Sequence, residues 1–482
     1  MDINSKAIKE LFSKSSDVLV RAIKINQNNI TFHIFCVDGL INSQQVDEAI
    51  FQTMALDKYI GEFKTERAVM DYLLSGGAYH VFTSEEADYQ LLLKYVLSGM
   101  VALIFDGEKK AIVYDVRMFD KRSISEPTEE GVIKGAKDAF IEVMRTNTAL
   151  IRRRIRSEYL VVESISVGKV SKTDMSLCYI SNIANMDTVN KIREKIQAIN
   201  IDNISTPAFI EEYLIENKKS LFPQIMYTQR PDRISANLSD GRIALVVDGI
   251  PFVYLLPCQL VMLMQSPEDY ANHFFVGSAL RGIRYLAMIV TLFLPAFYIA
   301  ATTYQNQMLP VQLALSTQSA KQNVPFSSAT EVLGLLIAFE ILIEAGLRLP
   351  KTVGTAMSIL GGLVVGQAAV TANIVSPLVV VIVALAGIAG FIMPNQDLSS
   401  GLRVIRFVFS VLAAIGGFLG LTVGLIIVLT HLCSMDNYGV AYLSPFVDIN
   451  ESNHKDTIFR FPIKYFRKRS EKIAPENHTK QK

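Results

Sequence analysis

The residues whose types and spacing best suit a chemical task lie on one predicted helix face between positions 353 and 375. Small and polar side chains recur on this face every three or four residues. Hydroxyl and amide groups on one helix, repeated around a ring of subunits, are the expected lining of an ion pathway. Small side chains also let helices pack closely within one subunit, which is the commoner reason for such a stripe. The stripe consists of Thr355, Ser358, Gly362, Gly366, Ala369 and Asn373.

Charges on the amphipathic segment 327–350 form a second candidate group. Glu340, Glu344 and Arg348 follow one another at intervals of four residues. Because carboxylates are costly in hydrocarbon, we expect this segment to lie at the membrane interface, to enter and return, or to face water in an assembly. A Glu344–Arg348 pair on an interfacial helix is the simpler interpretation. In an oligomeric channel, Glu340 and Glu344 would be vestibule charges that attract cations.

Two further motifs are candidates for contacts between elements. A basic run at the end of a helix predicted over 131–157 either complements the helix dipole in solvent or contacts another domain or anionic lipid. Its arginines are Arg152, Arg153, Arg154 and Arg156. A glycine pattern in the last apolar run predicts close helix packing, and its members are Gly416, Gly420 and Gly424.

Motifs of enzymes are absent from the sequence. It contains no GxxxxGK[ST], no GxGxxG between a strand and a helix, no HExxH and no GxSxG. Its six histidines are scattered, and its four cysteines lie far apart, which predicts buried reduced thiols and neither a metal site nor a disulfide framework. A net charge of +1 gives no case for nucleic-acid binding. We therefore expect no catalysis, no cofactor and no metal.

Long apolar runs predict an integral membrane domain in the second half of the chain. A helix needs about 20 mostly apolar residues to cross a bilayer, and four runs are candidates. These are 283–303, 353–375, 377–393, which is at the short limit, and 404–429. Basic residues before the first run and in the tail place both ends of the domain in the cytoplasm. About four spans plus the amphipathic segment are expected, although the charges leave the topology of 327–350 open.

The region before the membrane domain has an alternating α/β pattern without a signal peptide, which predicts a cytoplasmic location. Residues 1–25 are predicted to form an amphipathic helix. Two lobes within the region look alike, because Gly99, Leu103 and Asp106 recur at an offset of 142 as identical residues. Duplication explains this better than a chance match of two Asp-Gly hairpins. The expected domains are a lobe over 1–120, a linker over 121–130, a lobe over 131–275, a membrane domain over 281–432 and a basic tail over 433–482.

From about Ser125 to the tail, the sequence resembles the A subunits of the GerA family of bacterial spore germinant receptors. No single stretch is specific, but the combination is. The matching stretches include SEPTEEGVIKGAKDAFIEVMRTNTALIRRRI, FPQIMYTQRPDRISANLSDGRIALVVDGIPFVYLLP, QSPEDYANHF, VPFSSATEVLGLLIAFEILIEAGLRLP, LGGLVVGQAAVTANIVSP and YGVAYLSPF.

The resemblance implies a multi-pass subunit in the inner membrane of a dormant spore. Such a subunit works with a transporter-like B subunit and a lipoprotein C subunit, and the B subunit is expected to hold the nutrient germinant. Self-association into a nutrient-gated ion channel is the implied function. Two alternatives stay open, namely a non-conducting scaffold that binds nutrient or signals, and a component of a secondary transporter. The resemblance also extends to a paralogue from the stage V sporulation operon, which belongs to the same family.

Overall fold

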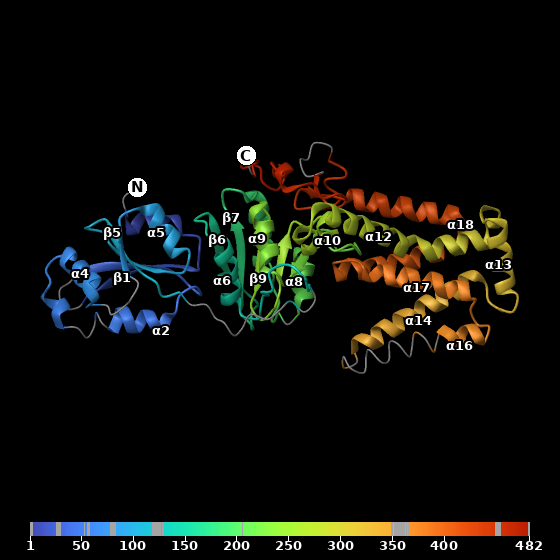
Figure 1. The fold of residues 1–482 in the computed structure, drawn as a ribbon, viewed down its shortest axis with the longest axis horizontal. Coiled ribbons are helices and arrows are strands. Elements are labelled where there is room, and N and C mark those ends of the chain that lie inside the picture. The colour runs from blue at the N-terminus through green and yellow to red at the C-terminus, as the bar shows by residue number, and fades with distance from the viewer. Residues whose placement is uncertain are drawn as a thin grey trace. The chain divides into compact units, whose positions relative to one another are not determined.

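The computed structural model divides the chain into two compact units, which are described separately. Unit 1 comprises Met1–Ile215, Ile225–Pro257 and Phe466–Lys482, and unit 2 comprises Glu216–Gln224 and Cys258–Tyr465. Figure 1 shows both units as a ribbon. The structure describes residues 3–25, 30–52, 54, 58–77, 83–117, 127, 130–204, 206–348, 350, 362, 364, 366–448 and 455–480.

The first lobe of unit 1 is an antiparallel five-stranded sheet between two helical layers. Its strand order is β1-β2-β4-β5-β3. The strands are β1 (Val18–Lys24), β2 (Thr31–Val37), β3 (Thr83–Glu86), β4 (Val101–Phe105) and β5 (Lys110–Tyr114). The helices are α1 (Ser5–Leu11), α2 (Ser43–Val46), α4 (Glu66–Tyr72) and α5 (Tyr89–Val96), with π-helical turns over Asp47–Gln52 and Leu73–Gly77 and a 3-10 turn over Lys58–Glu62.

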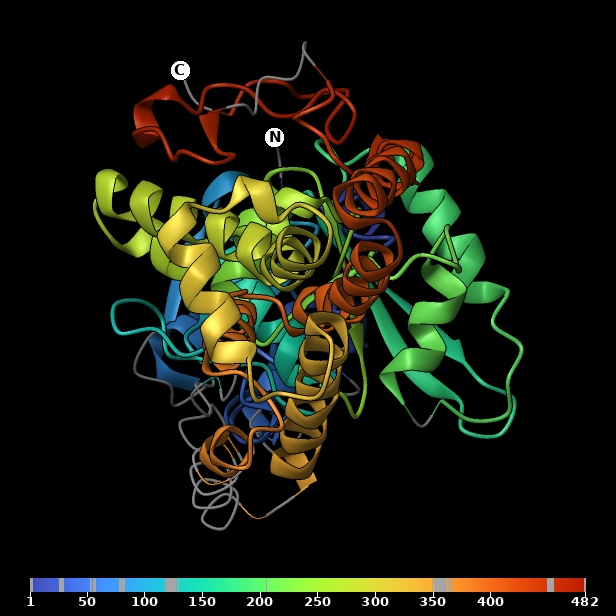
Figure 2. The same ribbon diagram turned by 90° about the vertical axis from the view of Figure 1, so that its right-hand side faces the viewer.

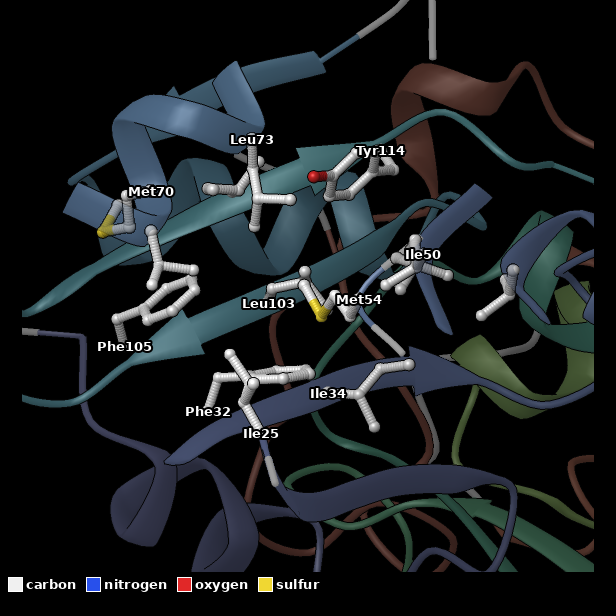
Figure 3. Close-up of a cluster of buried hydrophobic side chains, with 14 of the residues drawn as sticks. Ile25, Phe32, Ile34, Ile50, Met54, Met70, Leu73, Leu103, Phe105 and Tyr114 are labelled. Carbon is white, nitrogen blue, oxygen red and sulfur yellow. The ribbon is translucent and has the colours of Figure 1, made fainter. Parts of the chain in front are cut away.

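Both faces of this sheet are buried, and strand β4 shows how. One apolar cluster contains Val101, Leu103 and Phe105. Side chains from α4 and from the turn after α2 complete this cluster. Ala102 and Ile104 point into a second cluster, which α1 and α5 cover. Figure 3 shows the first cluster, with Leu103 and Phe105 of the sheet beside Met70 and Leu73 of the helical layer on that face. Successive strand residues face opposite sides, so a centrally placed strand is apolar throughout.

The second lobe repeats this sheet with the order β6-β7-β9-β10-β8. Its strands are β6 (Leu160–Val167), β7 (Thr173–Ile180), β8 (Met226–Thr228), β9 (Ile243–Val247) and β10 (Val253–Leu256), and its helices are α6 (Met144–Arg154), α7 (Met186–Gln197), α8 (Pro207–Leu214) and α9 (Pro231–Ser239). Register is conserved as well as order: Leu103 faces Ile112 in the first sheet, and Leu245 faces Tyr254 in the second. Both members of the pair are shifted by 142 positions, which confirms the predicted similarity of the lobes.

Two elements of unit 1 differ from the sequence prediction. Residues 1–25 hold the short helix α1 and then strand β1 instead of one amphipathic helix. The helix predicted over 131–157 begins only at Met144. The preceding segment is held in a non-helical form, because the Arg230 guanidinium donates to the carbonyls of Glu130 and Ala136.

Unit 2 is mainly helical. Its helices are α10 (Leu260–Met264), α11 (Pro267–Ala271), α12 (Phe274–Thr303), α13 (Val311–Lys321), α14 (Ser328–Arg348), α16 (Gly366–Thr371), α17 (Pro377–Phe391) and α18 (Gln396–Ser434), with short 3-10 turns and the small strands β11 (Asp436–Asn437) and β12 (Val440–Ala441). Figure 2 looks approximately along α12. Among the described residues, α12 and α18 are long and apolar enough to cross a membrane, and α17 is a shorter apolar helix.

Helix α18 is an antiparallel hairpin of two arms, residues 396–416 and 418–434. Its backbone leaves the helical region at Gly417, with φ 58° and ψ −138°. Leu221 lies against Gly401 in the first arm, and its neighbour Ser220 lies 2.9 Å from the His431 ring nitrogen in the second. In a straight helix, positions 401 and 431 would be about 45 Å apart. The prediction of one continuous span over 404–429 is therefore wrong, because the chain reverses at the Gly416–Gly417 pair.

The end of the chain returns to unit 1. Ile473 accepts a hydrogen bond from the backbone of Asn185 at 3.1 Å, and the Arg469 guanidinium donates to the carbonyl of Ser239 at 2.8 Å. Lys480 pairs with Asp240. These contacts attach the tail to the second lobe, so the chain leaves unit 1 and comes back to it.

Candidate functional site

The candidate site is the helical core of unit 2, and the two ends of α12 define its base and its tip. The base lies at the start of α12, and the tip lies where Tyr304 follows its last turn. There, the Tyr304 hydroxyl donates to the carbonyls of Ala414 and Ile415, just before the bend of α18. Phe293 packs against Phe409 farther along the same two helices, with ring centroids 4.9 Å apart. The first arm of α18 thus runs beside α12 toward the tip.

Glycines of the last apolar run lie at the contact between the two arms of α18. A Cβ at Gly420 would overlap the carbonyl oxygen of Leu412, and one at Gly424 would lie 2.8 Å from the Leu412 Cδ1 atom. Gly416 has open space around it. The packing that the GxxxGxxxG pattern predicts is therefore seen at two of its three positions, within one chain.

At the base, a buried charge cluster holds the start of α12. The Asp269 carboxylate accepts from Arg281 at 3.2 Å and from Arg284 at 2.7 Å. Asp456 accepts from Arg281 at 2.8 Å, and Arg460 stacks on the Tyr270 ring at 5.1 Å. Asp269 and Arg281 are both fully buried, so each charge depends on its partners. From the sequence, the two arginines are only topology signals; their partner Asp269 lies 12 residues before Arg281, and Asp456 lies 175 residues after it.

Glu340 is the centre of a second charge cluster. Its carboxylate accepts from Arg403 at 3.0 Å and from Arg406 at 2.9 Å, and Arg406 is fully buried. The cluster of Glu340, Arg403 and Arg406 therefore carries more positive than negative charge. Glu344 and Arg348 form an exposed pair one helical turn apart, as predicted for the interfacial alternative. Because Arg403 and Arg406 already neutralise its charge, Glu340 does not fit the hypothesis of a vestibule charge that attracts cations.

The predicted small-polar stripe is described only in part. Thr355 and Ser358 lie outside the described residues. Gly362 is exposed, Gly366 begins α16, and Ala369 lies on that helix, half-buried. Asn373 follows the end of the helix with φ 54°, where an asparagine commonly stops a helix. The structure thus keeps Gly366 and Ala369 on one short helix and places Asn373 beyond it.

The arginines at the end of α6 lie in different environments, some paired with acidic side chains and some exposed. Arg152 is fully buried between the lobes of unit 1, where its guanidinium donates to Asp17 at 2.7 and 3.0 Å. Arg152 is therefore buried away from lipid, and its contact is with the other lobe, as in the interdomain alternative. Arg154 pairs with Asp138 at 2.6 Å, while Arg153 and Arg156 are exposed.

The cysteines give a first testable expectation. Cys36, Cys178 and Cys258 are buried, and Cys433 is exposed. Burial raises the pKa of Cys36 to about 12, with a smaller contribution from the Asp38 carboxylate, and burial raises the pKa of Cys178 to about 12. At pH 8 we expect iodoacetamide to alkylate both thiols roughly a thousandfold more slowly in the folded protein than in urea. Mass spectrometry after a short pulse measures this, and equal rates in the two conditions would contradict it.

Within the part of the chain that the structure describes, no group of three or more histidine, cysteine or acidic side chains could hold a metal ion. The site is thus made of packed helices, small residues and paired charges. It defines the class of proteins that join an α/β region to a helical unit with candidate membrane spans.

Comparison with known proteins identifies the family. The model of the Bacillus/Clostridium GerA spore germination protein family matches residues 6–472, and the chain belongs to this family. Spore germination protein KA of Bacillus subtilis (strain 168) is 35% identical over 99% of this chain and 87% of that protein. The uncharacterized membrane protein YfkQ of the same strain is 36% identical over 93% of this chain and 86% of that protein. The crystal structure of the N-terminal domain of the A subunit of the Bacillus megaterium spore germinant receptor GerK3 matches with a TM-score of 0.42 and 28% identity, covering 54% of this chain and 98% of that one.

Proposed function

We propose that this protein is the A subunit of a spore germinant receptor and forms, as an oligomer, a nutrient-gated ion pathway through the spore inner membrane. The match to the GerA family over residues 6–472 is the observation that carries the proposal. A transporter-like B subunit and a lipoprotein C subunit are the proposed partners, with the nutrient bound by the B subunit. Unit 1 lies in the cytoplasm.

The helices of unit 2 run alternately toward the tip and toward the base, which supports a bundle that crosses the membrane. Helix α14 starts near the tip, because Lys321 and Ser328 line one pocket together with Thr302 in the last turn of α12. Glu331 pairs with Lys321 at 3.0 Å and accepts from the Ser376 backbone at 2.7 Å. Helix α17 starts at the same end, directly after Ser376. The described part of the chain therefore passes to the tip in α12, back from it in α14 and in α17, and to it and back in the two arms of α18.

This order makes α14 a full crossing instead of an interfacial helix. Arg348 and Arg403 then fall on the same side as Arg281, in agreement with the preference of basic residues for the cytoplasmic face. Added to the four predicted spans, a full crossing of α14 would put the basic tail outside, whereas the reversal of α18 at Gly417 returns the end of the chain toward the base.

Exposed polar groups on and after α16 support an ion pathway between copies. Gln367, Thr371 and Asn373 are exposed in the single chain, although apolar segments flank them. Polar groups at membrane depth face water or a neighbouring helix. With Ala369 on the same short helix, a ring of subunits would present hydroxyls, amides and small side chains to a shared axis.

The experiment fills this face with a bulky side chain. Replacing Ala369 by leucine in a receptor-dependent spore should abolish potassium release triggered by a mixture of amino acids, sugars and nucleosides. Replacing it by serine, which is close in size, should leave release nearly unchanged, and immunoblots of spore membranes confirm equal receptor levels. If an assembled Ala369→Leu receptor released potassium as the wild type does, this face would not line the pathway, and a non-conducting scaffold would be favoured.

A further inference from the structure

Residues 455–465 expose apolar and aromatic side chains outside any long helix. Phe459 and Ile463 are each 62% exposed, Tyr465 is 55% exposed and Phe461 is 46% exposed. Aromatic side chains normally supply much of a buried core. Four large apolar groups left open within seven residues mark a surface that contacts something other than water.

The segment is held firmly at the base of unit 2. The Ser278 hydroxyl donates to the carbonyl of Arg460 at 3.0 Å and accepts from its backbone N–H at 2.9 Å. The Arg460 guanidinium donates to the carbonyl of Asn272 at 3.0 Å, and Asp456 pairs with Arg281. These bonds fix the segment beside the first two turns of α12, just before the apolar run that starts at Ile283.

Basic side chains alternate with the aromatic ones. Lys455 lies over the Tyr465 ring at 5.9 Å, and Lys464 stands exposed between Ile463 and Tyr465. Among residues 455–465 the charge balance is positive, because Lys455, Arg460 and Lys464 outnumber Asp456. Aromatic rings at the depth of lipid headgroups, with lysines beside them, are the composition of a membrane-surface contact.

We propose that residues 455–465 form a membrane-surface patch that binds the headgroups of anionic phospholipids. The patch inserts Phe459, Phe461 and Ile463 at the headgroup boundary and places Lys455 and Lys464 against lipid phosphates. It fixes the depth of the first span and joins the bilayer surface to the tail that returns to unit 1. The inference rests on the proposed crossing of the membrane by α12.

The chain contains no tryptophan, so one substitution makes a specific fluorescent reporter. The full-length protein is placed in nanodiscs of phosphatidylcholine with phosphatidylglycerol, or of phosphatidylcholine alone. Phe459→Trp reports the patch, Ile289→Trp reports the span, and Val170→Trp, at a site 76% exposed in unit 1, reports water. In the anionic discs, the reporter of Phe459→Trp should be quenched by lipids brominated near the headgroup and protected from iodide. Substituting Lys455 or Lys464 by glutamine should reduce this protection roughly fivefold for each lysine.

The outcomes separate the patch from the span on which it rests. If iodide quenches the Phe459→Trp reporter as strongly as the Val170→Trp reporter, while brominated chains quench the Ile289→Trp reporter, the patch is overturned and the span stands. If brominated lipid quenches neither, both are overturned. Equal protection in phosphatidylcholine alone would overturn the selectivity for anionic lipid, and protection that needs the partner subunits would make the patch a protein interface.

Discussion

Alanine at position 420 should prevent the two arms of α18 from closing. A Cβ there would overlap the carbonyl oxygen of Leu412, and backbone cannot move aside as a flexible side chain can. Overpacking of this kind costs about 3 kcal/mol or opens the contact. We expect Gly420→Ala to lower the thermal unfolding midpoint of the detergent-purified protein, and to abolish germinant-triggered potassium release in spores.

Gly416 offers the matched control in the same motif. It has open space where a Cβ would stand, so Gly416→Ala should unfold close to the wild-type midpoint. The hairpin itself is checked by labelling: the native Cys433 thiol and a cysteine at Asp397 should react with a membrane-impermeant maleimide from the same side. Labelling from opposite sides, or a Gly420→Ala protein as stable as Gly416→Ala, would refute the hairpin.

Sequence patterns predicted the sheets better than the helices, and the reason is physical. A central strand such as β4 is apolar on both faces, and the Asp-Gly hairpin after it sets the register that the two lobes share. Strand 18–24 is not evident from the sequence, because no glycine or proline separates it from the short amphipathic helix before it. The helix expected over 131–143 fails because Arg230, about a hundred positions away, binds the carbonyls of that segment. Local composition carries no information on such a partner.

The membrane half shows a similar limit. The length of an apolar run indicates where a helix lies. It does not show whether a helix such as the one over 404–429 is straight or bent at Gly417. The sequence marks the charged residues in that half as unusual but does not show their partners, because Glu340 meets Arg403 and Arg406 only after α14 and α18 pack. Residue types and spacing predict the small-polar stripe, but neither shows that the helix ends before Asn373.

Replacing Arg152 by methionine should destabilise unit 1 more than any change to the exposed arginines beside it. Its guanidinium makes two hydrogen bonds to Asp17, which is only 8% exposed, and a third contact to the Ser15 hydroxyl at 3.4 Å. Removing one partner of a buried pair leaves the other charge without compensation, which costs about 3–5 kcal/mol. For a unit of this size, that loss lowers the thermal midpoint by roughly 10 °C. Thermal unfolding of the full-length protein followed by circular dichroism measures it.

Two further variants show that the pair itself, and not the loss of a long side chain, is responsible. Arg156→Ala, an exposed change from the same basic run, should shift the midpoint little. Asp17→Asn combined with Arg152→Met removes both charges, so the double variant should be more stable than the sum of the single losses predicts. The lobes meet at this point, since the Ser16 backbone donates to the carbonyl of Val162 in the edge strand β6 at 2.8 Å. If the two losses simply add, the pair contributes no coupling, and the contact between the lobes rests on backbone bonds such as this one.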